Sequence, residues 1–291
     1  MNEIIKLWNN RQIITKQAPP SITTYLLDDG APHGAILVIP GGGYGCVCES
    51  TEGYAIARRF NELGFHTLVL DYRCQPHRYP EPQQDALRAM KIIRGNAEAW
   101  KIIPDQIAAC GFSAGGHLTG CLGTLQNEDI DASDQDEYDA VAPWPTALIM
   151  GYPVISLEGW SNVHTGKNLL GDKYNELQVK YSLQYRINEK TPPSFVWCTF
   201  ADQMVPYQNS LIFAEVMAKA GRPCELHVFP YGAHGMLLGI DTIDVGQWTS
   251  LAANFLRTQW KRQSLAEGSE ERKAFDDLYT NAVQAKLEPP R

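Results

Sequence analysis

The pentapeptide Gly111-Phe-Ser-Ala-Gly115 is the feature that most constrains the fold of this chain. It directly follows an apolar run, 107–110, and precedes a helix-compatible segment, 114–125. A buried strand, a sharp turn and a helix in this order form a nucleophile elbow, which exposes the central serine at the turn. Such a turn leaves no room for a Cβ atom two residues before or after the serine, and glycine stands at both positions. We therefore predict that Ser113 is a nucleophile at the carboxyl end of a buried strand, beside the electropositive start of a helix.

Strand-like and helix-like segments alternate through most of the chain. Continuous apolar runs are typical of strands in a sheet that is covered on both faces. The alternation therefore predicts an α/β fold with a mostly parallel central sheet and helices on both faces. The expected strands are 23–27, 35–39, 67–70, 107–110, 147–150, 194–200 and 226–228, and the expected helices are 54–63, 83–97, 208–220 and 245–261.

The length of 291 residues fits one large α/β domain or two small ones, and we expect a single domain with its core at about 20–262. The segment 156–191 has no strong period and is interpreted as an insertion over the strand ends. The polar, acidic segment 126–139 is interpreted as an exposed loop. The segment 269–286 predicts an amphipathic helix, which we expect to pack on its own domain, with a contact in a homo-oligomer as the alternative.

Charge and cysteine content limit the partners and the compartment. The net charge is −8 and Lys and Arg form no run, so nucleic acid and anionic membranes are poor candidate partners. The N-terminal segment does not resemble a signal peptide and no apolar run reaches membrane-spanning length. Seven scattered cysteines suit reduced thiols better than a disulfide framework, so we expect a cytoplasmic protein. Cys46 and Cys48 lack further soft ligands in register, and we predict no metal site there.

A serine hydroxyl needs a base within hydrogen-bond reach, and that base must be held in one tautomer. In an open parallel sheet, such groups come from loops at the carboxyl ends of strands. Asp202 is the first carboxylate after the strand 194–200, and His234 follows the last strand between two glycines. The order serine, aspartate, histidine is the order this architecture uses. We predict that Ser113 attacks an acyl carbon, that His234 is the general base and acid, and that Asp202 orients His234.

The tetrahedral intermediate of acyl transfer carries an oxyanion, which needs preorganised N–H donors. The amide of Ala114, directly after the nucleophile, is one expected donor. The others are expected from Gly42 and Gly43, because the glycines after the strand 35–39 leave backbone amides unobstructed. Tyr44, the next residue, is expected to wall the substrate pocket. A phosphate-binding loop is excluded, because no Gly-Lys-Ser/Thr sequence follows at the required spacing.

Other polar residues near these loops are interpreted as structural. His117 lies one helical turn after Ser113, inside the helix below the elbow. Glu49 and Glu52 follow the glycines and either fix that loop by hydrogen bonds or favour a helix start. His164 is interpreted as solvated, with substrate contact as the alternative. Asp71 and Asp85 are candidate supports of the site. His227 lies within the last strand and is expected to point sideways from the sheet.

Six motifs together resemble the α/β-hydrolase fold serine esterases. The likeness is greatest to the small acetyl esterase and acetylxylan esterase-like group, which is related to the hormone-sensitive-lipase-like enzymes, and it spans roughly residues 20 to 260. Pro40 stands where the wider lipase-like group has histidine, and the segment after Ser269 lies outside the resemblance. The motifs are Pro40-Gly-Gly-Gly-Tyr44, Gly111-Phe-Ser-Ala-Gly-Gly-His-Leu118, Tyr152-Pro-Val-Ile155, Thr191-Pro-Pro-Ser-Phe195, Asp202-Gln-Met-Val-Pro206 and His234-Gly235.

The resemblance implies hydrolysis of short acyl esters, acetyl groups on sugars or xylo-oligosaccharides foremost, with no cofactor. Trp144 and Trp160 are candidate stacking platforms for a sugar ring, although core packing explains a tryptophan as well. A serine peptidase of the prolyl-oligopeptidase type shares the triad order and is an alternative, but it usually needs an additional domain. A catalytically silent binding protein with this fold is a further alternative, but such proteins typically lack a triad member or the glycine loop.

Overall fold

The computed structural model describes residues 2–13, 18–159 and 163–287, with side chains described as far as residue 278. Its centre is an eight-stranded sheet in the order β1-β2-β4-β3-β5-β6-β7-β8. β2 pairs antiparallel with both of its neighbours, and the six strands from β4 to β8 pair in parallel. This arrangement confirms the predicted fold class. The strands are β1 (Ile4–Lys6), β2 (Ser21–Tyr25), β3 (His33–Ile39), β4 (His66–Asp71), β5 (Ile102–Phe112), β6 (Ala147–Gly151), β7 (Ser194–Thr199) and β8 (Cys224–Phe229).

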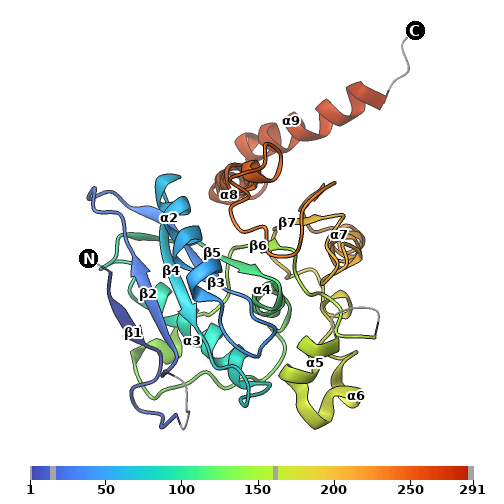
Figure 1. The fold of residues 1–291 in the computed structure, drawn as a ribbon. Helices are drawn as coiled ribbons and strands as arrows, with labels where there is room; N and C mark the ends of the chain where they lie inside the picture. The colour runs from blue at the N-terminus through green and yellow to red at the C-terminus, as the bar shows by residue number, and fades with distance from the viewer. Residues whose placement is uncertain (1, 14–17, 160–162, 288–291) are drawn as a thin grey trace.

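Helices cover both faces of the sheet, as Figure 1 shows. Successive side chains of a strand point to opposite faces, so Ile36 and Val38 of β3 pack with one group of helices and Leu37 and Ile39 with the other. The first group is α2 (Tyr54–Glu62) and α8 (Trp248–Ser264), and the second is α3 (Glu81–Gly95), α4 (Ala114–Thr124) and α7 (Gln208–Lys219). Both faces of the sheet are therefore covered by helices and shielded from solvent, which explains why the strands appear in the sequence as continuous apolar runs.

The segment predicted as an insertion, 156–191, forms short helices. They are α5 (Val163–Leu170) and α6 (Tyr174–Leu177), with a 3₁₀ turn between them at Gly171–Lys173 and a second one after α6 at Leu183–Tyr185. Leu169 and Leu170 of α5 are buried in the same core as α4. A short helix, α1 (Glu49–Glu52), also precedes α2, and 3₁₀ turns lie at Glu137–Ala140 and Val245–Gln247.

The prediction of an exposed acidic loop at 126–139 is wrong for Asp134, which is buried. Arg88 of α3 is also buried and forms ion pairs with Asp134, at 3.7 Å, and with Asp136. The carboxylate of Asp134 further accepts hydrogen bonds from the backbone amides of residues 9–11. Buried charges need partners, and here the acidic segment supplies them to α3 while it fixes the start of the chain.

The C-terminal helix α9 (Glu270–Leu287) projects away from the sheet (Figure 1). Its first turns are held by an ion pair between Arg262 at the end of α8 and Asp276, at 2.6 Å. Leu278 is 69% exposed. The expectation that this helix packs on its own domain is therefore wrong for Leu278, because α9 leaves the domain after its first turns.

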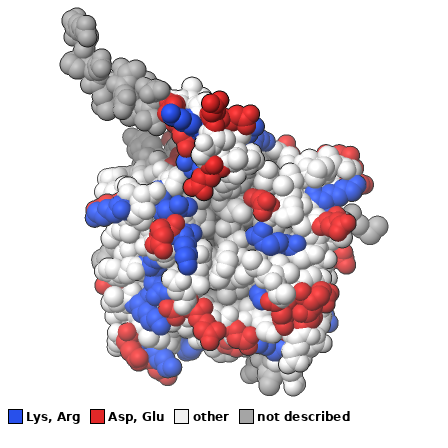
Figure 2. Space-filling view, turned by 180° about the vertical axis from the view of Figure 1, so that it is seen from behind, with Lys and Arg blue, Asp and Glu red and all other residues white. Residues whose placement is uncertain are grey.

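Within the described residues, no helix is long and apolar enough to cross a membrane. Figure 2 shows one face of the molecule, on which Lys and Arg side chains are interspersed with Asp and Glu. On this face, the two kinds of charged side chain are mixed rather than gathered into separate patches.

Candidate active site

Ser113 lies at the sharp turn between β5 and α4. Its backbone has φ 54° and ψ −120°, a conformation that side-chain-bearing residues rarely adopt. A Cβ atom at Gly111 would lie 2.2 Å from the carbonyl oxygen of Gly115, and one at Gly115 would lie 2.2 Å from the carbonyl oxygen of Ile39. The glycines are thus required by the close approach of strand and helix, as the sequence predicts.

The loops after β7 and β8 bring Asp202 and His234 to Ser113. His234 Nε2 lies 2.9 Å from Ser113 Oγ, and His234 Nδ1 lies 2.7 Å from Asp202 Oδ2. The Asp202 side chain is fully buried, and its second oxygen accepts the backbone N–H groups of Met204 and Val205 at 2.8 and 2.9 Å. A carboxylate only accepts hydrogen bonds, so Nδ1 of His234 carries the proton and Nε2 is free to accept the serine proton. The structure thus joins the three predicted residues, and their catalytic roles remain a prediction.

The glycine loop after β3 is held by bonds that leave two amides available. The N–H of Gly41 donates to the Glu52 carboxylate at 2.6 Å, and the carbonyl of Gly43 accepts from the Asn168 side chain at 2.8 Å. Gly42 and Gly43 have positive φ values of 126° and 62°. Within the described part of the chain, the N–H groups of Gly42 and Gly43 donate to no protein oxygen.

A cleft of about 410 Å³ opens beside the Ser113 hydroxyl. Gly42 and Gly43 form part of its wall. The amide of Ala114 is the first of α4, next to the nucleophile. The structure therefore places all three expected oxyanion donors around Ser113, and their role remains a prediction. The lining residues are Gly42, Gly43, Cys48, Thr51, Glu52, Ser113, His164, Thr165, Met204, His234, Gly235 and Leu237.

The expectation that Tyr44 walls the substrate pocket is wrong. Its side chain is fully buried, and its hydroxyl hydrogen-bonds His117 Nδ1 at 2.9 Å. The positive φ of Tyr44, 56°, turns the ring under the loop and into the core. His117 Nε2 bonds the carbonyl of Tyr181 at 2.9 Å, so Nδ1 accepts from the Tyr44 hydroxyl. Burial lowers the pKa of His117 to about 4, opposed by the bond to Tyr181. The His117 ring is fully buried and does not line the cleft, in agreement with a structural role.

The remaining predicted residues divide between the cleft and other parts of the molecule. Glu52 fixes the glycine loop by a hydrogen bond, one of the two roles expected. His164 is exposed, as expected of a solvated side chain, and it lies on the cleft wall, so contact with substrate stays open as the alternative. Asp85 is buried against Arg73 and Trp8, away from the cleft.

Asp71, at the end of β4, does not line the cleft, and burial raises the pKa of its carboxyl to about 6. His227 bonds Glu225 within β8, 2.9 Å away, as expected for a residue that points sideways. Trp144 precedes β6, so it lies at the opposite end of the strands from Ser113 and cannot stack on a bound sugar there. Trp160 lies outside the described residues.

Several residues in and around the site were not predicted from the sequence, and Met204, Thr165, Asn168 and Tyr152 are examples. Met204 follows Asp202 by two residues, so its position in the same loop was a usable signal. Thr165 and Asn168 come from α5, in a segment without helical periodicity. Tyr152 follows β6, and its ring lies edge-on to the His234 ring with centroids 5.0 Å apart, a contact that only the tertiary structure reveals.

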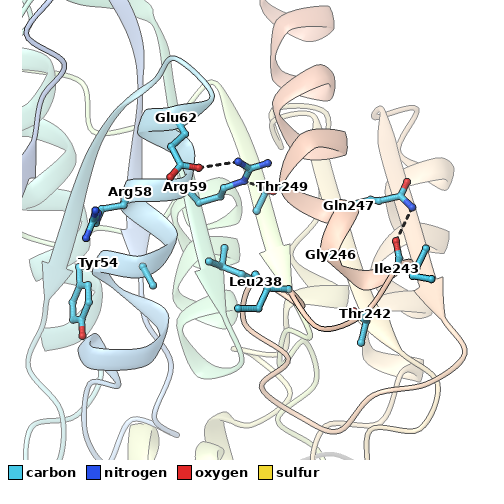
Figure 3. A pocket seen from close by; sticks show the side chains of 12 residues that line it. Tyr54, Arg58, Arg59, Glu62, Leu238, Thr242, Ile243, Gly246, Gln247 and Thr249 are labelled. Carbon is cyan, nitrogen blue, oxygen red and sulfur yellow. Dashed lines mark hydrogen bonds and ion pairs between the residues drawn. The ribbon is translucent and has the colours of Figure 1, made fainter.

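A larger surface hollow, of about 670 Å³, lies between α2 and the loop that follows His234 (Figure 3). One wall carries Tyr54, Arg58 and Arg59, and the other carries Leu238 and Ile243. None of the predicted catalytic or oxyanion residues lines it. The smaller cleft is therefore the candidate active site.

Comparison with known proteins agrees with this geometry. The family model BD-FAE matches residues 26–217. The chain belongs to the BD-FAE family. A solved relative, the acetyl ester-xyloside bifunctional hydrolase from Caldicellulosiruptor lactoaceticus, superposes on this BD-FAE chain with a TM-score of 0.81 and 36% identity, covering 88% of this chain and 96% of that one. MGS-M1, an α/β hydrolase enzyme from a deep-sea metagenome library, superposes with a TM-score of 0.66 and 27% identity, covering 89% and 97%. The BD-FAE chain therefore has the α/β-hydrolase fold that the motifs implied.

Curated relatives are longer proteins. Endo-1,4-beta-xylanase B of Butyrivibrio fibrisolvens is 34% identical over 227 residues, which is 76% of this BD-FAE chain and 35% of the xylanase. Acetylxylan esterase of Xylanibacter ruminicola is 30% identical over 258 residues, which is 80% of this chain and 51% of the esterase. The chain thus spans between about a third and a half of the length of these two relatives.

Proposed function

We propose that this chain is a serine carboxylesterase that hydrolyses short acyl esters, acetyl groups on sugars or xylo-oligosaccharides foremost. The observation that carries the proposal is the continuous chain of hydrogen bonds from Asp202 through His234 to Ser113, 2.7 and 2.9 Å long, at the wall of an open cleft. The names of two relatives, an acetylxylan esterase and an acetyl ester-xyloside hydrolase, support acetylated sugars as the substrate class.

The reaction proceeds through an acyl-enzyme on Ser113. As its Oγ attacks the ester carbon, the hydroxyl proton passes to Nε2 of His234, and the carbonyl π electrons move to oxygen. The amides of Gly42, Gly43 and Ala114 stabilise the resulting oxyanion. Collapse of this intermediate breaks the bond to the alcohol oxygen, which takes the proton from His234.

A water molecule then attacks the acyl-enzyme in the same way, with His234 first as base and then as acid, and releases the carboxylic acid and the free serine. Asp202 holds Nδ1–H of His234 throughout and stabilises the imidazolium. Every proton and electron pair is supplied by these side chains, the ester and water, so the proposed reaction uses no cofactor. No cluster of metal-ligating side chains occurs among the described residues.

The test combines active-site labelling with a substrate series. A fluorophosphonate probe should label the wild type and not Ser113→Ala. Turnover should be greatest for acetyl esters, acetylated xylo-oligosaccharides included. A short-chain esterase should also show a steep fall in turnover beyond butyryl. A chromogenic dipeptide amide, included in the series, should be hydrolysed much more slowly. Dominant amide cleavage would indicate a peptidase, and absence of labelling would indicate a silent binding protein.

Location and assembly are further parts of the proposal. We infer a cytoplasmic location, supported by seven cysteines that are all free. A homo-oligomer through α9 is supported by the exposure of Leu278 on a helix that leaves the domain. Sedimentation of the full chain beside a chain ending at residue 268 should show dissociation on truncation. The same number of chains per sedimenting particle in both samples would exclude this contact.

A further inference from the structure

Glu52 is a buried carboxylate that the proposed reaction does not use. It ends α1, and the residue is only 6% exposed. Its two oxygens are each occupied: Oε2 accepts the Gly41 N–H at 2.6 Å, and Oε1 accepts the Tyr152 hydroxyl at 2.8 Å. Within the described residues, no Lys or Arg pairs with it. Burial raises the pKa of this carboxyl, opposed by the bonds from Gly41 and Tyr152 and by the charge of His234. Burying an acidic group without a cation is costly, so its position calls for an explanation.

The carboxylate lies directly behind the nucleophile. A Cβ atom at Gly41 would lie 2.7 Å from the carbonyl oxygen of Phe112, 2.8 Å from Glu52 Oε2 and 3.0 Å from Ser113 Cβ. One glycine therefore separates Glu52 from Ser113. Because that glycine begins the loop that carries Gly42 and Gly43, the position of Glu52 fixes where this loop starts relative to the serine.

The second oxygen connects Glu52 to the base. Tyr152, whose hydroxyl it accepts, is buried, and the ring of Tyr152 lies edge-on to the ring of His234 with centroids 5.0 Å apart. One carboxylate thus contacts the glycine loop directly and the imidazole through a single aromatic ring.

We propose that Glu52 is a positioning residue for the reaction, which holds the glycine loop in its oxyanion-binding shape and, through Tyr152, holds the ring of His234. This inference depends on the proposed esterase function. Oxyanion donors accelerate a reaction because they are already aimed when charge develops. Three consecutive glycines are conformationally free, so they need an external restraint to stay aimed. Glu52 supplies that restraint and also occupies the Gly41 amide, which leaves the amides of Gly42 and Gly43 to the ligand.

The experiment separates positioning from mere support of the fold. Glu52→Ala removes both acceptors. Glu52→Gln keeps an oxygen for the Gly41 N–H and offers an NH₂ group to the Tyr152 hydroxyl oxygen, so it retains the geometry without the charge. Glu49→Ala is the matched control, because Glu49 belongs to the same short helix and does not line the cleft. Each variant is assayed for kcat and KM on p-nitrophenyl acetate, for the rate of fluorophosphonate labelling and for thermal unfolding.

We expect Glu52→Ala to lose about 100-fold in kcat with KM within about threefold, comparable to the loss of one oxyanion donor. Labelling of Ser113 should slow in parallel, because the tetrahedral phosphorus adduct uses the same amides. The kcat of Glu52→Gln should lie within about tenfold of the wild-type kcat, and the kcat of the control Glu49→Ala should equal that of the wild type. A folded Glu52→Ala enzyme with unchanged kcat overturns the proposal, and so does a glutamine variant as impaired as the alanine variant.

If Glu52→Ala does not fold, Tyr152→Phe decides the question. That variant removes one of the two bonds and should lower kcat with little effect on KM, whereas an unchanged kcat overturns the proposal. The wild type and Ser113→Ala are assayed in parallel. A wild type that hydrolyses no ester refutes the proposed function itself, which keeps the two failures distinct.

Discussion

Asp202→Asn is the substitution whose effect follows most directly from the geometry of the site. Oδ1 of Asp202 accepts the N–H groups of Met204 and Val205, and Oδ2 accepts Nδ1–H of His234. An asparagine would keep its oxygen toward the two backbone donors, because its NH₂ group cannot accept from them. The NH₂ group would then face Nδ1 of His234 and donate to it. The imidazole proton must in consequence move to Nε2, which can no longer accept the proton of Ser113.

The expected magnitude follows from the loss of the base. With the wrong tautomer in place, kcat should fall roughly 10³- to 10⁴-fold, equivalent to about 4–5.5 kcal/mol of barrier. The fold should be retained, because the side chain keeps its shape and two of its three hydrogen bonds.

Initial rates on p-nitrophenyl acetate near neutral pH measure the loss, with Ser113→Ala as the background and thermal unfolding as the control for structure. Asp202→Ala is the comparison that removes the loop bonds as well, and it should unfold at lower temperature than Asp202→Asn. An asparagine variant that retains a tenth or more of the wild-type kcat would refute the reasoning, since His234 would then not depend on Asp202 for its tautomer.

Three further predictions concern parts of the site that do not touch substrate. Gly115→Ala should lower the free energy of unfolding by about 2–4 kcal/mol in urea, because a Cβ atom would lie 2.2 Å from the Ile39 carbonyl; an unchanged midpoint would contradict the close approach. Tyr44→Phe leaves Nδ1 of His117 with only the weak thiol donor of Cys121, 3.6 Å away, and should cost about 1–3 kcal/mol of stability, while KM for acetyl esters stays within about twofold because Tyr44 does not line the cleft. A large rise in KM would restore Tyr44 as a substrate contact. Burial lowers the pKa of His117 from 6.5 to about 4, so between these values the unfolded chain binds a proton that the folded chain does not. The full stability is present above pH 6.5, and about 3 kcal/mol of it is lost as the pH falls toward 4. The free energy of unfolding in urea, measured at both ends of this window, should therefore change less in His117→Gln than in the wild type. An equal change in the two proteins would disprove the assignment to His117.

The fold could be predicted largely because local sequence patterns indicate its strands, helices and turns. Strands buried on both faces appear in the sequence as apolar runs. Glycine is required on both sides of Ser113 because the strand and the helix approach too closely there for a Cβ atom. Asp202 and His234 could be found because the carboxyl ends of parallel strands meet at one edge of the sheet. The strand β1 is only three residues long and gave no pattern to detect. The segment 156–191 has no strong apolar period that would have predicted its short helices, which are stabilised by contacts with the rest of the domain.

The errors share a different cause, which is that the decisive partner is remote in sequence. Tyr44 follows the glycine loop directly, yet its backbone conformation turns it away from the cleft toward His117, 73 residues later. Asp134 reads as one of several exposed acids until Arg88 is known to lie opposite it. The hydrogen bond between Glu52 and Tyr152 joins residues 100 positions apart. Side-chain pairs of this kind are set by tertiary packing, and a single sequence does not reveal them.

The bonds between Asp134 and residues 9–11 have a practical consequence for anyone who engineers this protein. Deleting those residues would strip three N–H donors from a buried carboxylate, so a shortened gene product would lose stability at a site distant from its cut end. An affinity tag joined ahead of residue 2 preserves these contacts, whereas a protease scar placed among them does not.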